Sequence, residues 1–200
     1  LGEFIVDDKG TVKIEDIGVS LLKDGSIDVS GSIDTAQDQL KLALGINNTG
    51  ADDFVRQNIA GRLNGSIDVK GETSSPVVNW NLDSGFARTD GMLFFQTDKQ
   101  LGQRTLKLDK VRLVPQNGGE LNAKGSLELF KDRKLQLDIV SKAFNPARID
   151  PQLPQGSVNG NINLTGILAQ EKFAGKMQFA PSTLNNVPLS GKADVVYESG

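Results

Sequence analysis

The chain carries an internal repeat, and this repeat constrains the possible folds more than any other feature of the sequence. Residues 11–33 align with residues 105–127 at an offset of 94, after which one added residue changes the offset to 95. At that second offset, GRLNGSIDVKG at 61–71 aligns with GSVNGNINLTG at 156–166. A register that holds for so long indicates two tandem copies of a unit of about 95 residues.

Both copies show the alternation of apolar and polar residues that is typical of β-strands. It is clearest in three segments: 40–47, 78–83 and 135–139. Period-two alternation places one face of a strand on apolar surroundings and the other in water. A unit of the form Gly-x-apolar-x-apolar-x-Gly recurs at 25–31, 65–71, 119–125 and 160–166. Glycines that bracket a short strand in this way predict turns, bulges or sharp bends of the sheet.

These patterns predict an all-β fold of roughly twelve to fourteen strands, mostly antiparallel because the connections are too short for helical crossovers. We place a first β-repeat at 1–104 and a second, continuous with it, at 105–200. The best helix candidate is a short one at 51–60, with a simple turn as the alternative. The three prolines within 144–154 argue against a long helix in that segment. All seven prolines of the chain are predicted at strand ends or in connections.

Composition excludes several classes of function. The formal net charge is −3, and the 22 basic and 25 acidic residues are scattered, so no basic stripe predicts nucleic-acid binding. The chain has no cysteine, which excludes disulfides and thiolate metal sites. It has no apolar run of the length that crosses a bilayer as a helix.

The chemistry of an active site is missing as well. There is no histidine, no Gly-x-Ser-x-Gly elbow, no phosphate-binding Gly-Lys-Ser/Thr loop and no Gly-x-Gly-x-x-Gly motif. The carboxylate pairs Asp7-Asp8 and Asp52-Asp53 are adjacent in sequence, as in solvated turns, rather than opposed across a cleft. Asp7 to Gly10 lacks the spaced ligands of a calcium loop. The sequence therefore predicts a protein that is not an enzyme and has no metal or cofactor.

Large aliphatic residues at alternate positions form the candidate functional site. In the first copy they are Ile27, Val29, Leu40, Leu42, Leu44, Ile67, Val69, Val78, Trp80 and Leu82. In the second copy they are Leu121, Leu127, Leu129, Leu135, Leu137, Ile139, Ile162, Leu164, Met177 and Phe179. Alternation alone favours two sheets that close face to face as a sandwich core. The alternative is one curled sheet with a partly open apolar trough, which suits acyl chains.

Three motifs, taken in order, resemble the TamB family of the AsmA-like superfamily, the translocation and assembly module proteins of Gram-negative envelopes. The stretch FNPARIDPQLPQG at 144–156, followed by VNGNINLTG, is similar to one family signature. The stretch at 180–191, APSTLNNVPLSG, is similar to another, although Asn185-Asn186 stand where a glycine is often found. The repeated glycine units fit the same family over residues 25–198.

The resemblance implies a U-shaped β-taco, a long curved antiparallel sheet with an apolar groove, to which the twenty residues above would contribute lining. It implies a periplasmic location, an N-terminal anchor in the inner membrane and an outer-membrane partner, the BamA-family protein TamA, both outside this middle fragment. The function implied is a non-catalytic conduit for phospholipid acyl chains between the two membranes, linked to outer-membrane protein assembly. A chaperone-like scaffold that pairs client strands, a closed-core spacer and a lipopolysaccharide bridge remain as alternatives.

Overall fold

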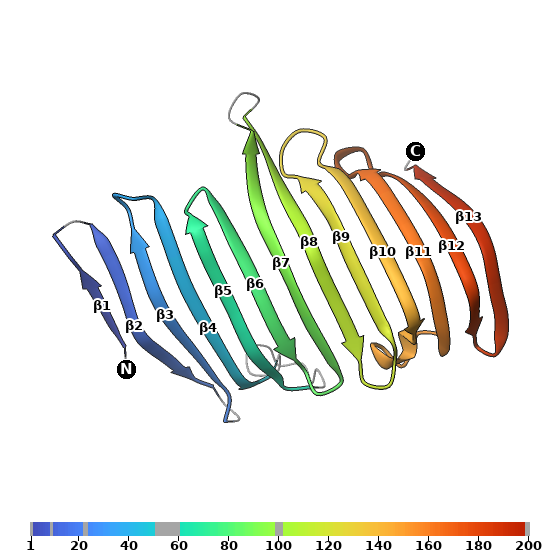
Figure 1. Cartoon of the computed structure of the whole chain (residues 1–200), viewed down its shortest axis with the longest axis horizontal. Helices are drawn as coiled ribbons and strands as arrows, with labels where there is room; N and C mark the ends of the chain where they lie inside the picture. Colours follow the sequence, from blue (N-terminus) through green and yellow to red (C-terminus); the bar gives the residue numbers. More distant parts are fainter. Residues whose placement is uncertain (1, 9, 22–23, 51–60, 99–101, 199–200) are drawn as a thin grey trace. The chain divides into compact units, whose positions relative to one another are not determined.

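The alternating segments fold as antiparallel β-strands joined by short connections, and the chain is all-β (Figure 1). The computed structural model describes residues 2–8, 10–21, 24–50, 61–98 and 102–198. Thirteen strands lie within them, which confirms the predicted number and the antiparallel arrangement. The helix predicted at 51–60 lies outside the described residues.

The chain divides into two compact units, Leu1–Gly85 and Phe86–Gly200. The strands of the first unit are β1 (Glu3–Val6), β2 (Thr11–Ser20), β3 (Ser26–Asp34), β4 (Gln39–Thr49), β5 (Leu63–Glu72) and β6 (Ser75–Asp83). They pair in chain order, each antiparallel to the next. Among the described strands β1 pairs with β2 alone, so this sheet is open.

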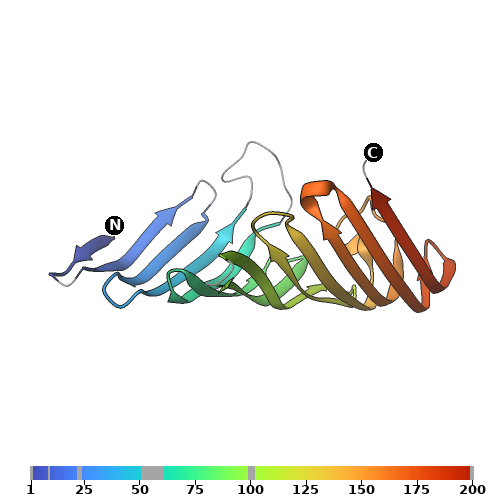
Figure 2. The same cartoon turned by 90° about the horizontal axis from the view of Figure 1, so that it is seen from above.

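The second unit is also an open antiparallel sheet in chain order. Its strands are β7 (Ala87–Asp98), β8 (Gln103–Pro115), β9 (Glu120–Glu128), β10 (Lys134–Phe144), β11 (Gly156–Ile167), β12 (Lys172–Leu184) and β13 (Val187–Glu198). Figure 2 shows that these strands are strongly twisted. The repeat boundary predicted at 104/105 falls inside β8.

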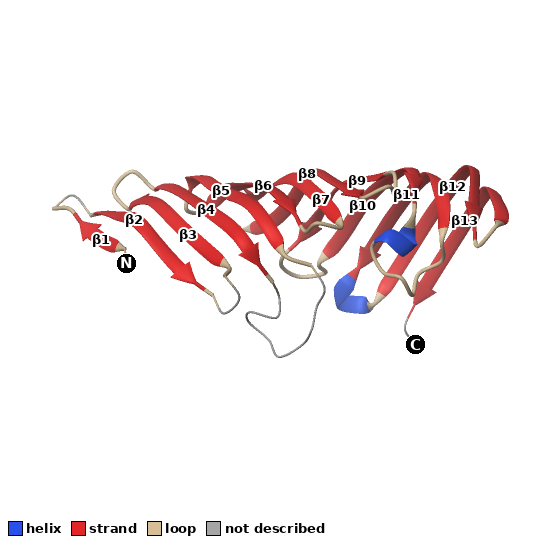
Figure 3. Ribbon diagram, turned by 90° about the horizontal axis from the view of Figure 1, so that it is seen from below, coloured by secondary structure: helices blue, strands red, loops and turns tan. Residues whose placement is uncertain are grey.

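Among the described residues, helical structure is confined to two short 3-10 turns, η2 (Pro146–Arg148) and η3 (Leu168–Gln170), both in connections of the second unit (Figure 3). The first lies within 144–154, where three prolines predicted the absence of a long helix. Asn145 caps it, because its side-chain Oδ1 accepts a hydrogen bond from the N–H of Ala147 at 3.2 Å.

Bulges interrupt the pairing in both units. In the first unit the register shifts between Ile14 and Ile17 of β2 and between Ile46 and Thr49 of β4. In the second it shifts, among other places, between Leu108 and Val111 of β8, Ser141 and Phe144 of β10, and Phe179 and Ser182 of β12. A bulge adds a residue to one strand, so it changes which residues of that strand point to a given face.

One prediction about prolines is wrong. Six of the seven lie at strand ends or in connections, but Pro181 lies inside β12, within the shift between Phe179 and Ser182. A bulge leaves a residue out of the ladder, so the missing N–H of proline removes no strand-to-strand hydrogen bond at that point.

Candidate apolar binding face

In the first unit, strand register brings the predicted apolar residues onto one face of the sheet. Val29, Leu44, Ile67 and Trp80 are opposite one another in consecutive strands β3 to β6. Residues that are directly opposite in antiparallel strands point to the same face. The register extends this face to all ten predicted residues of the first copy.

The second unit has an equivalent face. Ile139, Ile162 and Met177 are opposite one another in β10, β11 and β12, and Leu137 is opposite Leu164. Nine of the ten predicted residues share this face through strand register. The tenth, Leu129, follows the end of β9 and its N–H donates to the carbonyl oxygen of Arg104 at 2.8 Å.

The described residues of each unit place no second layer on the apolar face. All twenty predicted residues are partly exposed, and none is buried. Among the described residues only Ile46 and Ala87 are buried hydrophobics, at 8% and 7% exposure, and no large side chain is fully buried. A sandwich core would bury large aliphatic side chains almost completely. The face-to-face packing that alternation alone favoured is therefore not found in the described part of either unit.

Several residues of the apolar face were not predicted. They are Ile14, Ile17 and Val19 in β2, Leu93 and Phe95 in β7, Leu106, Leu108, Val111 and Leu113 in β8, and Phe173 in β12. In β2 and β8 a bulge changes the apolar positions from even to odd numbers, which breaks simple alternation. The sequence signal for such a bulge is a spacing of three between two apolar residues, as between Leu108 and Val111, in place of the regular spacing of two.

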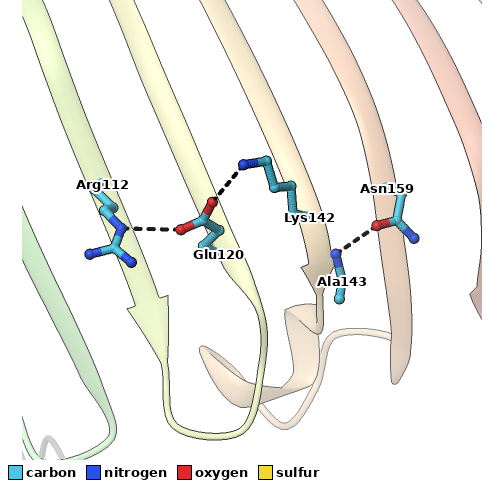
Figure 4. A network of polar contacts seen from close by, with 5 residues as sticks. All are labelled: Arg112, Glu120, Lys142, Ala143 and Asn159. Atoms are coloured by element: carbon cyan, nitrogen blue, oxygen red, sulfur yellow. Dashed lines mark hydrogen bonds and ion pairs between the residues drawn. The ribbon is translucent and has the colours of Figure 1, made fainter.

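The opposite face is polar, and in the second unit it carries a three-strand ion cluster (Figure 4). Glu120 in β9 lies between Arg112 of β8, whose Nε donates to its Oε2 at 3.1 Å, and Lys142 of β10, whose Nζ is 3.2 Å from its Oε1. Hydrogen bonds from Lys142, and then from Arg112, lower the pKa of Glu120 below its ordinary value of 4.5. The cluster thus links the neighbouring strands β8, β9 and β10 through side chains on the polar face.

The lowered pKa of Glu120 predicts a pH-dependent contribution to stability. A carboxyl group whose pKa is lower in the folded chain contributes fully above its unfolded pKa, and the contribution is lost as the pH falls through the folded value. We expect Glu120→Gln to lower the urea unfolding midpoint at pH 7, and the difference from the wild type to shrink once the pH falls below 4.5. An equal difference at pH 7 and pH 2 would contradict this assignment.

Asparagine side chains hold two of the bulges. In the second unit the Oδ1 of Asn159 accepts a hydrogen bond from the N–H of Ala143 at 2.8 Å (Figure 4). In the first unit the Oδ1 of Asn64 accepts one from the N–H of Asn48, also at 2.8 Å. Ala143 and Asn48 both have positive φ, +48° and +45°. The asparagines therefore satisfy backbone donors that the bulges take out of the strand ladder.

A hollow in the second unit lies over the polar face rather than the apolar one. It has a volume of about 590 Å³ and is bordered by residues of β8 to β13. Leu135 is the one predicted apolar residue among those that border it. The apolar face is therefore a broad partly exposed surface, and the hollow is a separate feature.

The acidic residues singled out in the sequence do not come together as a metal site in the described part of the chain. No group of three or more His, Cys, Asp or Glu side chains among the described residues is placed to hold a metal ion. Asp7 acts as a turn former, since its Oδ1 accepts a hydrogen bond from the N–H of Thr11 at 2.8 Å. Asp52 and Asp53 lie outside the described residues. The part of the chain that is described also has no helix with the length and hydrophobicity needed to cross a bilayer.

No protein-family model, curated protein or solved structure matches the chain.

Proposed function

We propose that the chain is a non-catalytic segment of a TamB-like conduit that carries phospholipid acyl chains across the periplasm of a Gram-negative bacterium. In this proposal the sheet forms a U-shaped β-taco whose inner wall is the apolar face. The full-length protein would be anchored in the inner membrane and would meet TamA through regions outside this fragment. Its transport would be linked to the assembly of outer-membrane proteins.

The observation that carries the proposal is the uncovered apolar face. In both units the open sheet presents rows of Leu, Ile and Val side chains that are partly exposed, and the described residues form no second layer over them. An apolar surface of this kind marks a binding site for an apolar partner. An acyl chain that lies on it contributes about 0.8 kcal/mol for each methylene removed from water and needs no hydrogen bond.

The tandem repeat belongs to the same proposal, and matched irregularities support it. The bulge between Ile14 and Ile17 has its equivalent 94 residues later, between Leu108 and Val111. The bulge at Ile46–Thr49 has its equivalent 95 residues later, at Ser141–Phe144. These are the two offsets of the sequence repeat. Two copies with the same bulges would present their apolar faces in the same way, as a conduit built by repetition requires.

Photo-crosslinking in cells tests this function. A photoreactive amino acid at Leu42, Trp80, Leu137 or Leu164 is expected to form an adduct with phospholipid, because these positions belong to the apolar face. The adduct is measured by mass spectrometry of the purified protein.

Matched positions on the polar face serve as controls. Lys41 in β4 and Asn163 in β11 are neighbours of Leu42 and Leu164 in sequence and point to the opposite face. They are expected to give little or no lipid adduct. Crosslinks from the apolar positions only to other parts of this chain would overturn the proposal and favour a closed spacer.

A further inference from the structure

The hollow over the polar face of the second unit has apolar side chains at one side and charged side chains at the other. Two rows of residues on the polar face form most of its border, and Leu135, Gly166, Phe173 and Tyr197 lie in the row between them. One row runs from Lys107 through Ser126, Gln136, Thr165 and Ala174 to Val196, and the other contains Lys134, Ile167, Lys172 and Glu198. Ile167, Ala174 and Val196 thus gather at the β11–β13 side of the hollow. Val196 is 79% exposed, which is costly for an aliphatic side chain that has no partner.

The opposite side of the hollow is basic. Three lysines and two glutamates border it, so its titratable groups carry a net charge of +1. Lys172 is paired with Glu198, with its Nζ 2.5 Å from Oε1. Since Glu198 compensates the charge of Lys172, the other charged residues of the hollow are Lys107, Lys134 and Glu128. Together they give one excess positive charge at the β8–β10 side.

Lys107 and Lys134 are near enough to act on one group. Lys107 is opposite Ser126, which is opposite Gln136, and Lys134 is two residues from Gln136 on the same face. With ordinary strand spacing and rise, their Cα atoms are about 12 Å apart. Each lysine side chain spans roughly half of that distance, so both ammonium groups can reach a single oxyanion between them.

We propose that this hollow is a binding site for a small amphiphile with an anionic head group, such as an alkyl phosphate. The head group is held by Lys107 and Lys134, with the hydroxyl groups of Thr105 and Ser126 beside them. The alkyl part lies on Ile167, Ala174 and Val196. The volume of about 590 Å³ is within the roughly 300–1,000 Å³ of ordinary small-molecule sites. This site is separate from the apolar face and does not depend on the conduit.

Titration of the protein with octyl phosphate tests the proposal, followed by the amide NMR signals of Ser126, Thr165 and Ala174. We expect saturable shifts at these amides and at least tenfold weaker binding of octyl glucoside, which has the same chain and an uncharged head group. Inorganic phosphate alone is expected to bind at least tenfold more weakly than octyl phosphate, because it lacks the alkyl part. If inorganic phosphate binds as tightly as octyl phosphate, the hollow is a simple anion site and the proposal of an amphiphile is wrong.

Two double variants separate this site from general charge effects. Lys107→Gln/Lys134→Gln is expected to weaken octyl phosphate binding at least tenfold. Lys176→Gln/Lys192→Gln removes two exposed lysines from the same polar face outside the hollow, and should leave binding within about twofold. Equal losses in both pairs would overturn the proposal. Leu137→Asp should leave this binding unchanged, so failure here and failure of the conduit are distinguishable.

Discussion

Leu137→Asp is expected to remove phospholipid from the apolar face while the sheet stays folded. Leu137 lies in the centre of β10, opposite Gly125 in β9 and Leu164 in β11. A carboxylate there would have to lose its water when an acyl chain covers it, and no cation of the face is opposite it in these strands. Burying an unpaired charge costs several kcal/mol. We therefore expect phospholipid recovered with the purified protein to fall at least tenfold, and transport in cells to stop.

Val140→Asp is the matched control for this variant. Val140 lies in the same strand, is 40% exposed and points to the polar face, opposite Asn122 and Asn161. The same carboxylate is therefore introduced three residues away without entering the apolar face. Circular dichroism and urea unfolding establish that both variants are folded. If Leu137→Asp retains the lipid content of the wild type, or if Val140→Asp loses as much, the apolar face is not the lipid site.

Gly31→Ala is expected to cause a large loss of stability. Gly31 lies inside β3 with φ +148°, in a region that is essentially restricted to glycine. A Cβ at this position would collide with the carbonyl oxygen of Lys41 and lie 2.8 Å from the Cα of Leu42, both backbone atoms of β4. Neither atom can move without breaking the ladder. We expect a loss of roughly 3 kcal/mol, seen as a fall of 1–2 M in the urea midpoint.

Gly45→Ala in the neighbouring strand β4 provides the comparison. Its φ is not in the positive range, and the nearest atom to a Cβ would be the Cβ of Asp28 at 3.8 Å, an ordinary contact. Replacing this glycine lowers the entropy of the unfolded chain, so the variant should be as stable as the wild type or up to about 1 kcal/mol more stable. Similar losses in the two variants would show that strand glycines are needed in general, and not for the conformation of Gly31.

Strand identity and the direction of most side chains follow from the sequence alone. Leu40, Leu42 and Leu44 alternate with polar or small residues through β4, and an uninterrupted strand with period two has only one way to turn these side chains to the same face. The same reasoning holds for Leu135, Leu137 and Ile139 of β10. These are strands whose central residues pair without a shift.

Alternation does not predict the side-chain directions of the bulged strands. In β8 the apolar positions change from Leu106 and Leu108 to Val111 and Leu113, so no single alternation describes the strand. The glycine units were read as short bracketed strands, yet Gly31 and Gly65 lie inside strands that continue past them. A bulge depends on the hydrogen bonds of the neighbouring strand, as Asn159 shows for Ala143, and those partners are remote in sequence.

The sequence by itself determined that this protein is an antiparallel sheet with an apolar face and a more polar one, because side-chain alternation is a local property of each strand. Only the tertiary structure decided that the described residues of neither unit place a second layer on the apolar face, and that a hollow of the second unit lies over the polar one. Alternation is the same whether an apolar face meets another sheet or remains partly exposed. What covers a face is set by the packing of distant segments, which the local pattern does not encode.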